Sequence, residues 1–395
     1  MGEGCDLAAT IRFVEDNIDE KDIAAVVMRA SATAGVDRDF AVAQIAGRRA
    51  AASKLPSWRA VDGLVYPVHL SMEQCSSEAT ARYKTALVEG DSLLDITGGF
   101  GVDFAWMSRA VKRGVMVERQ SALCDIARYN FDLLGFDNVG VVEGDGVEYL
   151  SRCGERSFDT IFVDPARRGY HGRRVVGIAD CTPDVGKLAP ILLACARRLV
   201  IIKLSPMLDP VDLARRLPAV ESIHVVAVHG ECKELLVVMR PGYNGDVAVV
   251  CINDDQVFQT TLGRTEPPKL WDGDTSLPLC LYEPNAAIMK AGCFGDLAAR
   301  YGVEQADTNT HLFLSRHAVP DFPGRRFEVH DVTTMNKREL KEKLKGVDSA
   351  NITCRNFPLT AVELRKRLKL KDGGDIYLMA ATAGGRQLIF ISRKI

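Results

Sequence analysis

The sequence of 395 residues is notable first for what it lacks. No apolar run approaches the ~20 residues that a membrane-spanning helix needs, which argues against a membrane protein. Its formal net charge is only −2, from 50 Lys+Arg and 52 Asp+Glu, so the whole chain is not a polycation that coats nucleic acid. Six acidic residues within the first 20 positions argue against a secretory signal. We therefore expect a cytoplasmic protein.

The 11 cysteines form no C-x-x-C pair, and their number is odd. Disulfide scaffolds are short and dense in cysteine, whereas zinc sites use closely paired ligands. We interpret the cysteines as reduced and mostly buried thiols, and we expect no metal site.

The chain does have enough apolar residues, at 47%, to build a large core, and its length predicts more than one domain. Residues 1–85 show the apolar spacing of helices. From Ser92 onward, short apolar runs alternate with helical stretches, which is typical of an α/β fold with a mostly parallel sheet. The predicted strands are 93–96, 115–117, 139–142, 160–163, 199–202, 223–228 and 235–239, and the helices between them are 102–111, 121–134, 146–151, 184–197 and 209–217.

The segment 241–245, Pro-Gly-Tyr-Asn-Gly, reads as a linker to two small α+β units. The first contains predicted strands and a helix over 285–300, and the second alternates strands and helices up to a C-terminal hairpin. The predicted domains are 1–85 (helical), 86–242 (α/β), 243–325 (α+β) and 326–395 (basic α+β).

Positive charge is concentrated in the last domain. Residues 326–395 contain 15 Lys+Arg and 8 Asp+Glu, a net charge of +7. Such asymmetry indicates a module that meets a polyanion. Lys366, Arg367 and Lys369 belong to the surface that would contact phosphates without reading bases.

A glycine-rich turn follows the first predicted strand and opens a helix. Glycines let backbone N–H groups approach a ligand at a helix N-terminus. Carboxylates follow each of the first three strands, where they suit an ammonium group, ribose hydroxyls and an adenine amine, respectively. The G-x-G-x-x-G spacing of dinucleotide sites is absent from this turn. The candidate cofactor residues are Asp95, Thr97, Gly98, Gly99, Gly101, Asp103, Glu118 and Asp145.

This pattern resembles class I S-adenosylmethionine-dependent methyltransferases over residues 92–240. At the end of the fourth strand, Asp164-Pro165-Ala166-Arg167 resembles the Asp-Pro-Pro-aromatic motif of enzymes that methylate exocyclic amines of nucleobases. The resemblance implies that Asp164 orients the amine towards the methyl group, with Pro165 and Arg167 near the substrate and Lys203 lining the pocket. Ala166 and Arg167 depart from the motif, which leaves amine specificity open.

A second set competes with this interpretation. Lys84, Asp164, Lys203 and Glu234 resemble, in order, the Lys-Asp-Lys-Glu tetrad of ribose 2′-O-methyltransferases, in which a lysine removes the hydroxyl proton. In either scheme Lys203 would face the substrate, and Glu234 is a candidate substrate residue.

Nearly the whole chain resembles one bacterial group of methyltransferases with a ferredoxin-like insert and a C-terminal THUMP-like domain. The segments that carry the resemblance are 73–84, 95–103, 164–167, 282–285, 322–325, 355–359, 363–368 and 372–375. It implies S-adenosylmethionine as cofactor and an RNA substrate, either rRNA or tRNA. We therefore predict an RNA methyltransferase that acts on an exocyclic base nitrogen. The alternatives are a ribose 2′-O-methyltransferase and a non-catalytic RNA-binding protein that keeps the fold.

Overall fold

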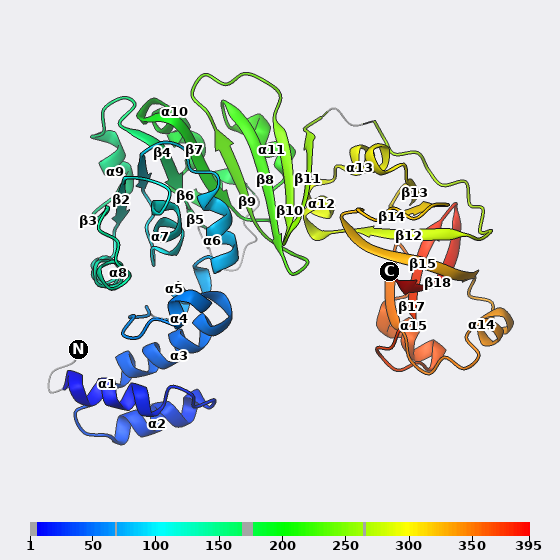
Figure 1. Ribbon diagram of the computed structural model, residues 1–395, viewed down its shortest axis with the longest axis horizontal. Helices are drawn as coiled ribbons and strands as arrows, with labels where there is room; N and C mark the ends of the chain where they lie inside the picture. Colours follow the sequence, from blue (N-terminus) through cyan, green and yellow to red (C-terminus); the bar gives the residue numbers. More distant parts are fainter. Residues whose placement is uncertain (1–5, 68, 168–176, 264–265) are drawn as a thin grey trace. The chain divides into compact units, whose positions relative to one another are not determined.

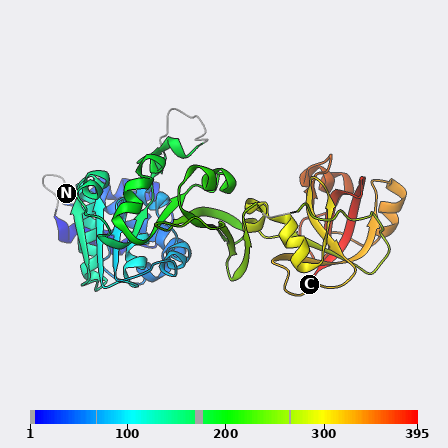
Figure 2. The same cartoon turned by 90° about the horizontal axis from the view of Figure 1, so that it is seen from above.

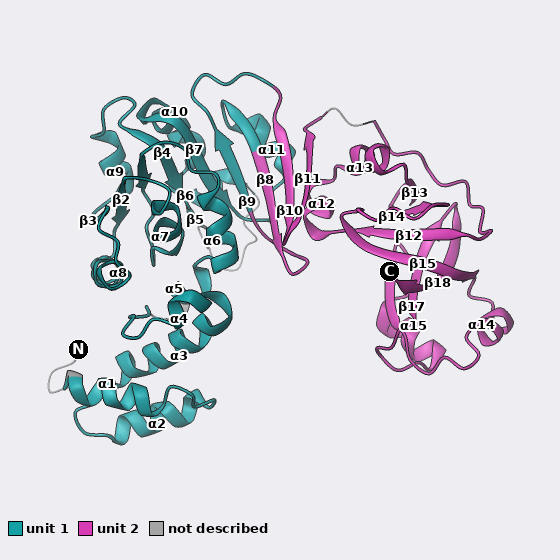
Figure 3. Ribbon diagram, in the orientation of Figure 1, with its two compact units in different colours: residues 1–222, 235–245 teal, residues 223–234, 246–395 magenta. Residues whose placement is uncertain are grey.

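The computed structural model describes residues 6–67, 69–167, 177–263 and 266–395. The chain divides into two compact units (Figure 3). The first comprises residues 1–222 and 235–245, and the second comprises residues 223–234 and 246–395. Part of the predicted α/β domain therefore clusters with the C-terminal residues.

The first unit begins with helices, as the apolar spacing predicts. They are α1 (Leu7–Asp16), α2 (Ile23–Ala32), α3 (Arg38–Lys54), α4 (Pro56–Arg59), α5 (His69–Gln74) and α6 (Glu78–Thr85). The side chain of Ser77 accepts a hydrogen bond from the Thr80 N–H, so Ser77 is the N-cap of α6. Phe13, Val26 and Ile45 are buried together and hold α1, α2 and α3 in one small core.

The α/β part of the first unit follows, and strands and helices alternate in it (Figures 1 and 2). The elements are β1 (Ser92–Asp95), α7 (Val102–Ser108), β2 (Arg113–Glu118), α8 (Ser121–Leu133), β3 (Val139–Glu143), α9 (Gly146–Ser151), β4 (Phe158–Val163), β5 (Ala166–Arg167), η1 (Ile178–Asp180), β6 (Cys181–Thr182), α10 (Val185–Cys195), β7 (Ala196–Leu204) and α11 (Pro210–Arg216). Strands β3, β2, β1, β4 and β7 are parallel neighbours in that order. The predicted parallel-rich α/β sheet is confirmed.

The sheet continues with β9 (Glu231–Met239), which runs antiparallel to β7. Its full strand order is β11-β10-β8-β9-β7-β4-β1-β2-β3, with β8 (Val220–Val228), β10 (Ala248–Asn253) and β11 (Gln256–Thr261). Strands β10 and β11 lie within the range 243–325 of the predicted third domain, yet they belong to this sheet.

The second unit also contains a sheet of seven strands, in the order β13-β14-β12-β15-β18-β17-β16. Its elements are β12 (Leu279–Pro284), α12 (Ala286–Ala291), α13 (Phe294–Tyr301), β13 (Glu304–Asp307), β14 (Thr310–Ser315), β15 (Gly324–Thr333), α14 (Lys337–Lys343), β16 (Asn351–Arg355), α15 (Ala361–Leu368), β17 (Tyr377–Ala383) and β18 (Arg386–Lys394). Consecutive residues of β17 point to opposite faces of this sheet, so Leu378 and Met379 are buried in two separate cores. Strands β12, β13 and β14, from the range 243–325, thus share one sheet with the strands of residues 324–394.

The single helix predicted over 285–300 was wrong. Helix α12 ends at Ala291 because Gly292 adopts a left-handed conformation, with φ of 70°, and caps it. Helix α13 then begins at Phe294.

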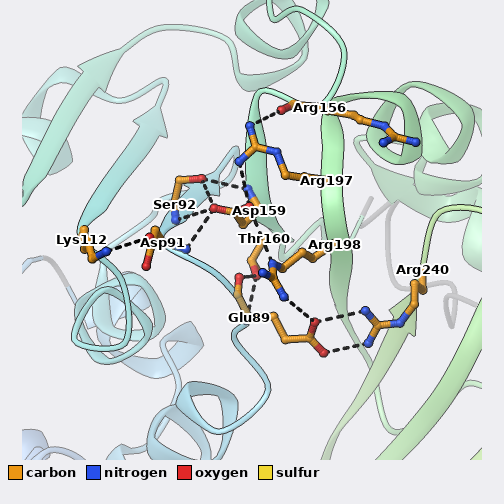
Figure 4. Close-up of polar contacts among 10 residues, drawn as sticks. All are labelled: Glu89, Asp91, Ser92, Lys112, Arg156, Asp159, Thr160, Arg197, Arg198 and Arg240. Atoms are coloured by element: carbon orange, nitrogen blue, oxygen red, sulfur yellow. Dashed lines mark hydrogen bonds and ion pairs between the residues drawn. The ribbon is translucent and has the colours of Figure 1, made fainter.

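Hydrogen bonds and ion pairs connect the amino ends of β1 and β4 (Figure 4). The Asp159 carboxylate accepts hydrogen bonds from the backbone N–H groups of Asp91 and Ser92, from the Ser92 hydroxyl and from the Arg197 guanidinium. A Cβ at Gly90 would lie 2.4 Å from that of Asp159, so this turn needs glycine. At the same edge, Arg240 pairs with Glu89 at 2.7 Å. We call this set the amino-edge network.

Candidate active site

The opposite edge of the sheet collects the predicted site residues. Asp95 and Glu118 are the last residues of β1 and β2, and Asp145 lies two residues beyond the end of β3. Asp164 directly follows β4, and Lys203 is the penultimate residue of β7. Because these five strands are parallel, their carboxyl ends share one edge, where α/β proteins bind ligands.

The glycine-rich turn is tightly packed against this edge. The Gly98 N–H donates to the carbonyl of Val117 at 2.9 Å, and the Gly99 N–H donates to Glu118 Oε2 at 2.7 Å. Gly101 has φ of 83° and forms the N-cap of α7, and a Cβ there would lie 2.8 Å from the Phe131 ring. Gly98 and Gly101 are therefore required by packing, whereas a Cβ at Gly99 would meet open space on most sides.

Asp95 is a buried carboxyl at the centre of the edge. It accepts hydrogen bonds from the N–H and the hydroxyl of Thr97 at 2.8 and 3.1 Å. The Thr97 oxygen in turn accepts from the backbone N–H of Asp164 at 2.7 Å. Burial raises the pKa of Asp95 to about 8, since Thr97 offsets only part of the desolvation and Asp103 and Asp164 add negative charge nearby. A cation beside Asp95 would relieve this cost.

Glu118 and Asp145 already make backbone contacts. Glu118 accepts from the N–H groups of Gly99 and Gln120, one on each oxygen. Asp145 is the N-cap of α9 and also pairs with Arg119. Burial alone would raise the pKa of Asp145, but its backbone hydrogen bonds and Arg119 lower it below the ordinary range.

Asp103, a predicted cofactor residue, lies in a buried ion cluster. Its Oδ1 is 3.1 Å from Lys84 Nζ and its Oδ2 is 3.1 Å from Lys203 Nζ. Lys203 Nζ also contacts Asp164 Oδ2 at 2.7 Å. The Ser76 hydroxyl donates to Asp103 Oδ2 at 2.7 Å. We call Ser76, Lys84, Asp103, Asp164 and Lys203 the carboxyl-edge network.

The structure describes only some of the residues that follow Asp164. Pro165 is buried, and Ala166–Arg167 form β5, in which Arg167 is opposite Cys181 of β6. The Arg167 side chain lies outside the described part of the structure, as does Arg168.

The remaining predicted residues are Glu234 and three cations near the end of the chain. Glu234 is buried in β9, just before Leu235, which is paired with Leu204. Lys366 and Arg367 are exposed in the last turn of α15, and exposed Lys369 caps that helix with φ of 59°. These cations belong to the second unit.

Sequence reasoning missed Ser76 as a site residue and placed Asp103 with the cofactor. The segment 73–84 is among those that carry the family resemblance, but the residues of it that reach the site depend on how α6 packs against α7.

Within the described ranges, no group of three or more His, Cys, Asp or Glu side chains could hold a metal ion, and no helix there is long and apolar enough to span a membrane.

The edge fits a cationic nucleoside on chemical grounds. Asp95 is a buried carboxyl whose charged form is disfavoured by its surroundings, and Glu118 has further lone pairs for hydroxyl groups. An ammonium or sulfonium group beside Asp95 and a ribose at Glu118 would satisfy both.

Comparisons with known proteins agree with this chemistry. Three family models match: a THUMP domain-like family over residues 324–394, a ferredoxin-like domain over 281–323, and protein-L-isoaspartate(D-aspartate) O-methyltransferase over 65–169. The crystal structure of a candidate methyltransferase from Porphyromonas gingivalis W83 is 35% identical, covers 98% of both chains and has a TM-score of 0.87. An uncharacterized S-adenosylmethionine-dependent methyltransferase of Mycobacterium tuberculosis (strain CDC 1551 / Oshkosh) is 25% identical and covers 82% of this chain and 87% of its own.

A further match is shorter. The protein-L-isoaspartate O-methyltransferase of Nitrobacter winogradskyi is 40% identical over 87 residues, which is 21% of this chain and 39% of that protein.

The fold and the comparisons together define an S-adenosylmethionine-dependent class I methyltransferase. More narrowly, the chain belongs to the family of such methyltransferases that carry a ferredoxin-like and a C-terminal THUMP-like domain.

Proposed function

We propose that this methyltransferase acts on RNA in the cytoplasm and methylates an exocyclic nitrogen of a base. The observation that supports this proposal is the exposure and the contacts of Asp164. Its side chain is 35% exposed, the highest value in the carboxyl-edge network, and one oxygen is held by Lys203 at 2.7 Å. The other oxygen is then placed to accept a hydrogen bond from an NH₂ group and orient its lone pair towards the methyl group.

S-adenosylmethionine supplies an activated methyl group, so the protein has to bind and orient rather than activate it. In this scheme Asp95 and Thr97 hold the methionine end, Glu118 the ribose and Asp145 the adenine. Gly99 leaves room at the turn for the cofactor. Asp145 would exchange its contact with Arg119 for the adenine amine.

The state of Lys203 favours a base nitrogen over a ribose oxygen. Its Nζ donates to Ser76 Oγ, Asp103 Oδ2 and Asp164 Oδ2 at 2.9, 3.1 and 2.7 Å. These acceptors, two of them carboxylate oxygens, favour an ammonium ion, whereas a ribose 2′-O-methyltransferase needs a lysine that takes up a proton. Lys84 is fully buried, so it has no access to a substrate.

RNA as the substrate is supported by the C-terminal residues. The match to a THUMP domain-like family covers 324–394, and the exposed Lys366, Arg367 and Lys369 lie together at the end of α15. Such cations bind phosphates and give affinity without reading sequence.

The test is mass spectrometry of nucleosides in rRNA and tRNA from cells with and without the gene. We expect one methylated nucleoside, modified on an exocyclic nitrogen, to disappear when the gene is deleted. A lost 2′-O-methylated nucleoside would favour the ribose alternative. Unchanged RNA together with methylation of another substrate would exclude RNA.

A further inference from the structure

Lys84 is an ammonium ion placed in the interior beside the active site. Its side chain is 0% exposed, and its Nζ is 3.1 Å from Asp103 Oδ1. It also donates to Ser76 Oγ and to the carbonyl of Thr80, both at 3.3 Å. Replacing a buried ion pair by apolar residues is often neutral or stabilising. Stability therefore does not explain why this pair lies here.

Asp103 connects Lys84 to the substrate side of the network. Burial alone would raise the pKa of Asp103, but the ammonium groups of Lys203 and Lys84 and the Ser76 hydroxyl lower it far below its ordinary range. Asp103 is therefore an anion between two cations at neutral pH.

Ser76 fixes the orientation of these groups. Its oxygen accepts from both lysines, at 2.9 Å from Lys203 and 3.3 Å from Lys84, and its proton goes to Asp103 at 2.7 Å. A hydroxyl has one proton to donate and two lone pairs to accept with, so its full capacity is used.

The charges balance only when Asp164 is included. Two ammonium ions face Asp103, which leaves one positive charge, and Asp164 Oδ2 meets it at 2.7 Å from Lys203. Side-chain exposure rises from 0% at Lys84 through 9% at Asp103 and 13% at Lys203 to 35% at Asp164. The network thus runs from the interior to the group that would touch the substrate.

We propose that Ser76, Lys84 and Asp103 are positioning residues, which hold Lys203 as an ammonium ion against one oxygen of Asp164 and leave the other oxygen for the acceptor group. The inference rests on the proposed role of Asp164, but it applies to any acceptor that Asp164 orients.

Lys84→Met tests the charge balance. It leaves two carboxylates sharing one ammonium ion, so the pair takes up its first proton at a higher pH. We expect the acid limb of the pH–rate profile for methyl transfer to move up by about one pH unit. Asp95 and the thiol of Cys75 also face the network, and burial raises the pKa of both. The assay therefore uses saturating S-adenosylmethionine, which removes the effect of Asp95 on cofactor binding.

A second variant restores the balance. Lys84→Met combined with Asp103→Asn removes one charge of each sign, and the acid limb should return to within about 0.3 pH unit of wild type. The milder Ser76→Ala, which keeps every charge, should lower kcat about tenfold and leave KM unchanged. Asp159→Asn is the matched control, because Asp159 is as buried as Asp103 and binds cations at the other edge. It should not move the limb.

A substrate-free measurement separates this inference from the choice of RNA. The carboxyl carbons of Asp103 and Asp164 are followed by NMR during a pH titration of protein labelled with ¹³C-aspartate. The same shift in Lys84→Met and, at Asp164, its reversal in the double variant are expected, even if no RNA is methylated. A folded Lys84→Met protein with unchanged titration and pH–rate profile would overturn the proposal, as would a double variant that fails to reverse the shift.

Discussion

The two edges of the nine-stranded sheet carry polar networks that differ in composition and burial. The amino-edge network uses arginines that are partly exposed, at 53% for Arg197 and 32% for Arg240, and Asp159 there accepts from backbone N–H groups. The carboxyl-edge network uses lysines that are 0% and 13% exposed, which meet mainly other side chains. The first joins segments of backbone and so stabilises the fold. The second orders side chains around Asp164, which is the arrangement that catalysis needs.

The largest expected difference between the edges is in turnover. Asp164→Asn removes the carboxylate that orients the acceptor, and we expect kcat for methyl transfer to fall about 10³-fold. Cofactor affinity, measured by calorimetry, should stay within about threefold, since the hydrogen bond from Asp164 to Thr97 uses the backbone N–H, which the variant keeps. Unchanged turnover would remove Asp164 from the mechanism.

Asp159→Asn should lower the stability of the protein and leave its turnover unchanged. It loses charged hydrogen bonds at the amino edge, and we expect the free energy of unfolding to fall by about 2 kcal/mol at pH 7 with kcat retained. Burial alone would raise the pKa of Asp159, but Ser92, Asp91 and Arg197 lower it. Its stabilising effect is therefore present above pH ~4 and is lost as the pH falls through the native pKa. Urea unfolding at several pH values measures it; equal stability of the two proteins at pH 7 would contradict this role.

Cofactor binding should be linked to proton release at Asp95. With a pKa of about 8, Asp95 is largely protonated at pH 7, and a cation beside it favours the charged form. Binding should therefore release a proton, and affinity should fall by up to about tenfold per pH unit below pH 8. Calorimetry in buffers of different ionisation enthalpy detects the proton. The Asp95→Asn protein should show no such release, and identical proton counts in both proteins would argue against this contact.

The smallest effect is expected for Arg240→Gln. Arg240 is 32% exposed and pairs with Glu89 and Glu221 in water-accessible positions. We expect the free energy of unfolding to fall by about 1 kcal/mol or less, and the loss should shrink in 1 M salt. Thermal unfolding at two salt concentrations measures this effect. A loss of stability as large as that of Asp159→Asn would contradict the expectation that buried residues of the amino-edge network stabilise the fold more than exposed ones.

Much of the α/β fold could be predicted because its signals are local. The alternation of strands and helices after Ser92 and the N-cap at Ser77 need only neighbouring residues. The acids at 95, 118 and 145 share an edge because parallel strands end together. Strand β12 was missed, since Pro278 directly before it and Pro284 as its last residue make a short apolar run look like a loop.

The carboxyl-edge network could not be predicted in full because its contacts depend on packing. The sequence shows that Lys84 and Asp103 are charged, but it does not show that they form an ion pair. That contact arises only where α6 packs on α7. Likewise, the sequence predicts strands at 247–252 and 257–262, close to β10 and β11, but it does not predict their sheet, because strand order depends on contacts distant in sequence.

The central claim is that Asp164, and not the equally acidic amino edge, directs methyl transfer to RNA. The most direct test is to complement cells that lack the gene with wild type, Asp164→Asn or Asp159→Asn and to quantify methylated nucleosides by mass spectrometry at matched protein levels. We expect wild type and Asp159→Asn to restore the missing nucleoside and Asp164→Asn to leave it absent. Restoration by Asp164→Asn to the wild-type level would contradict the account.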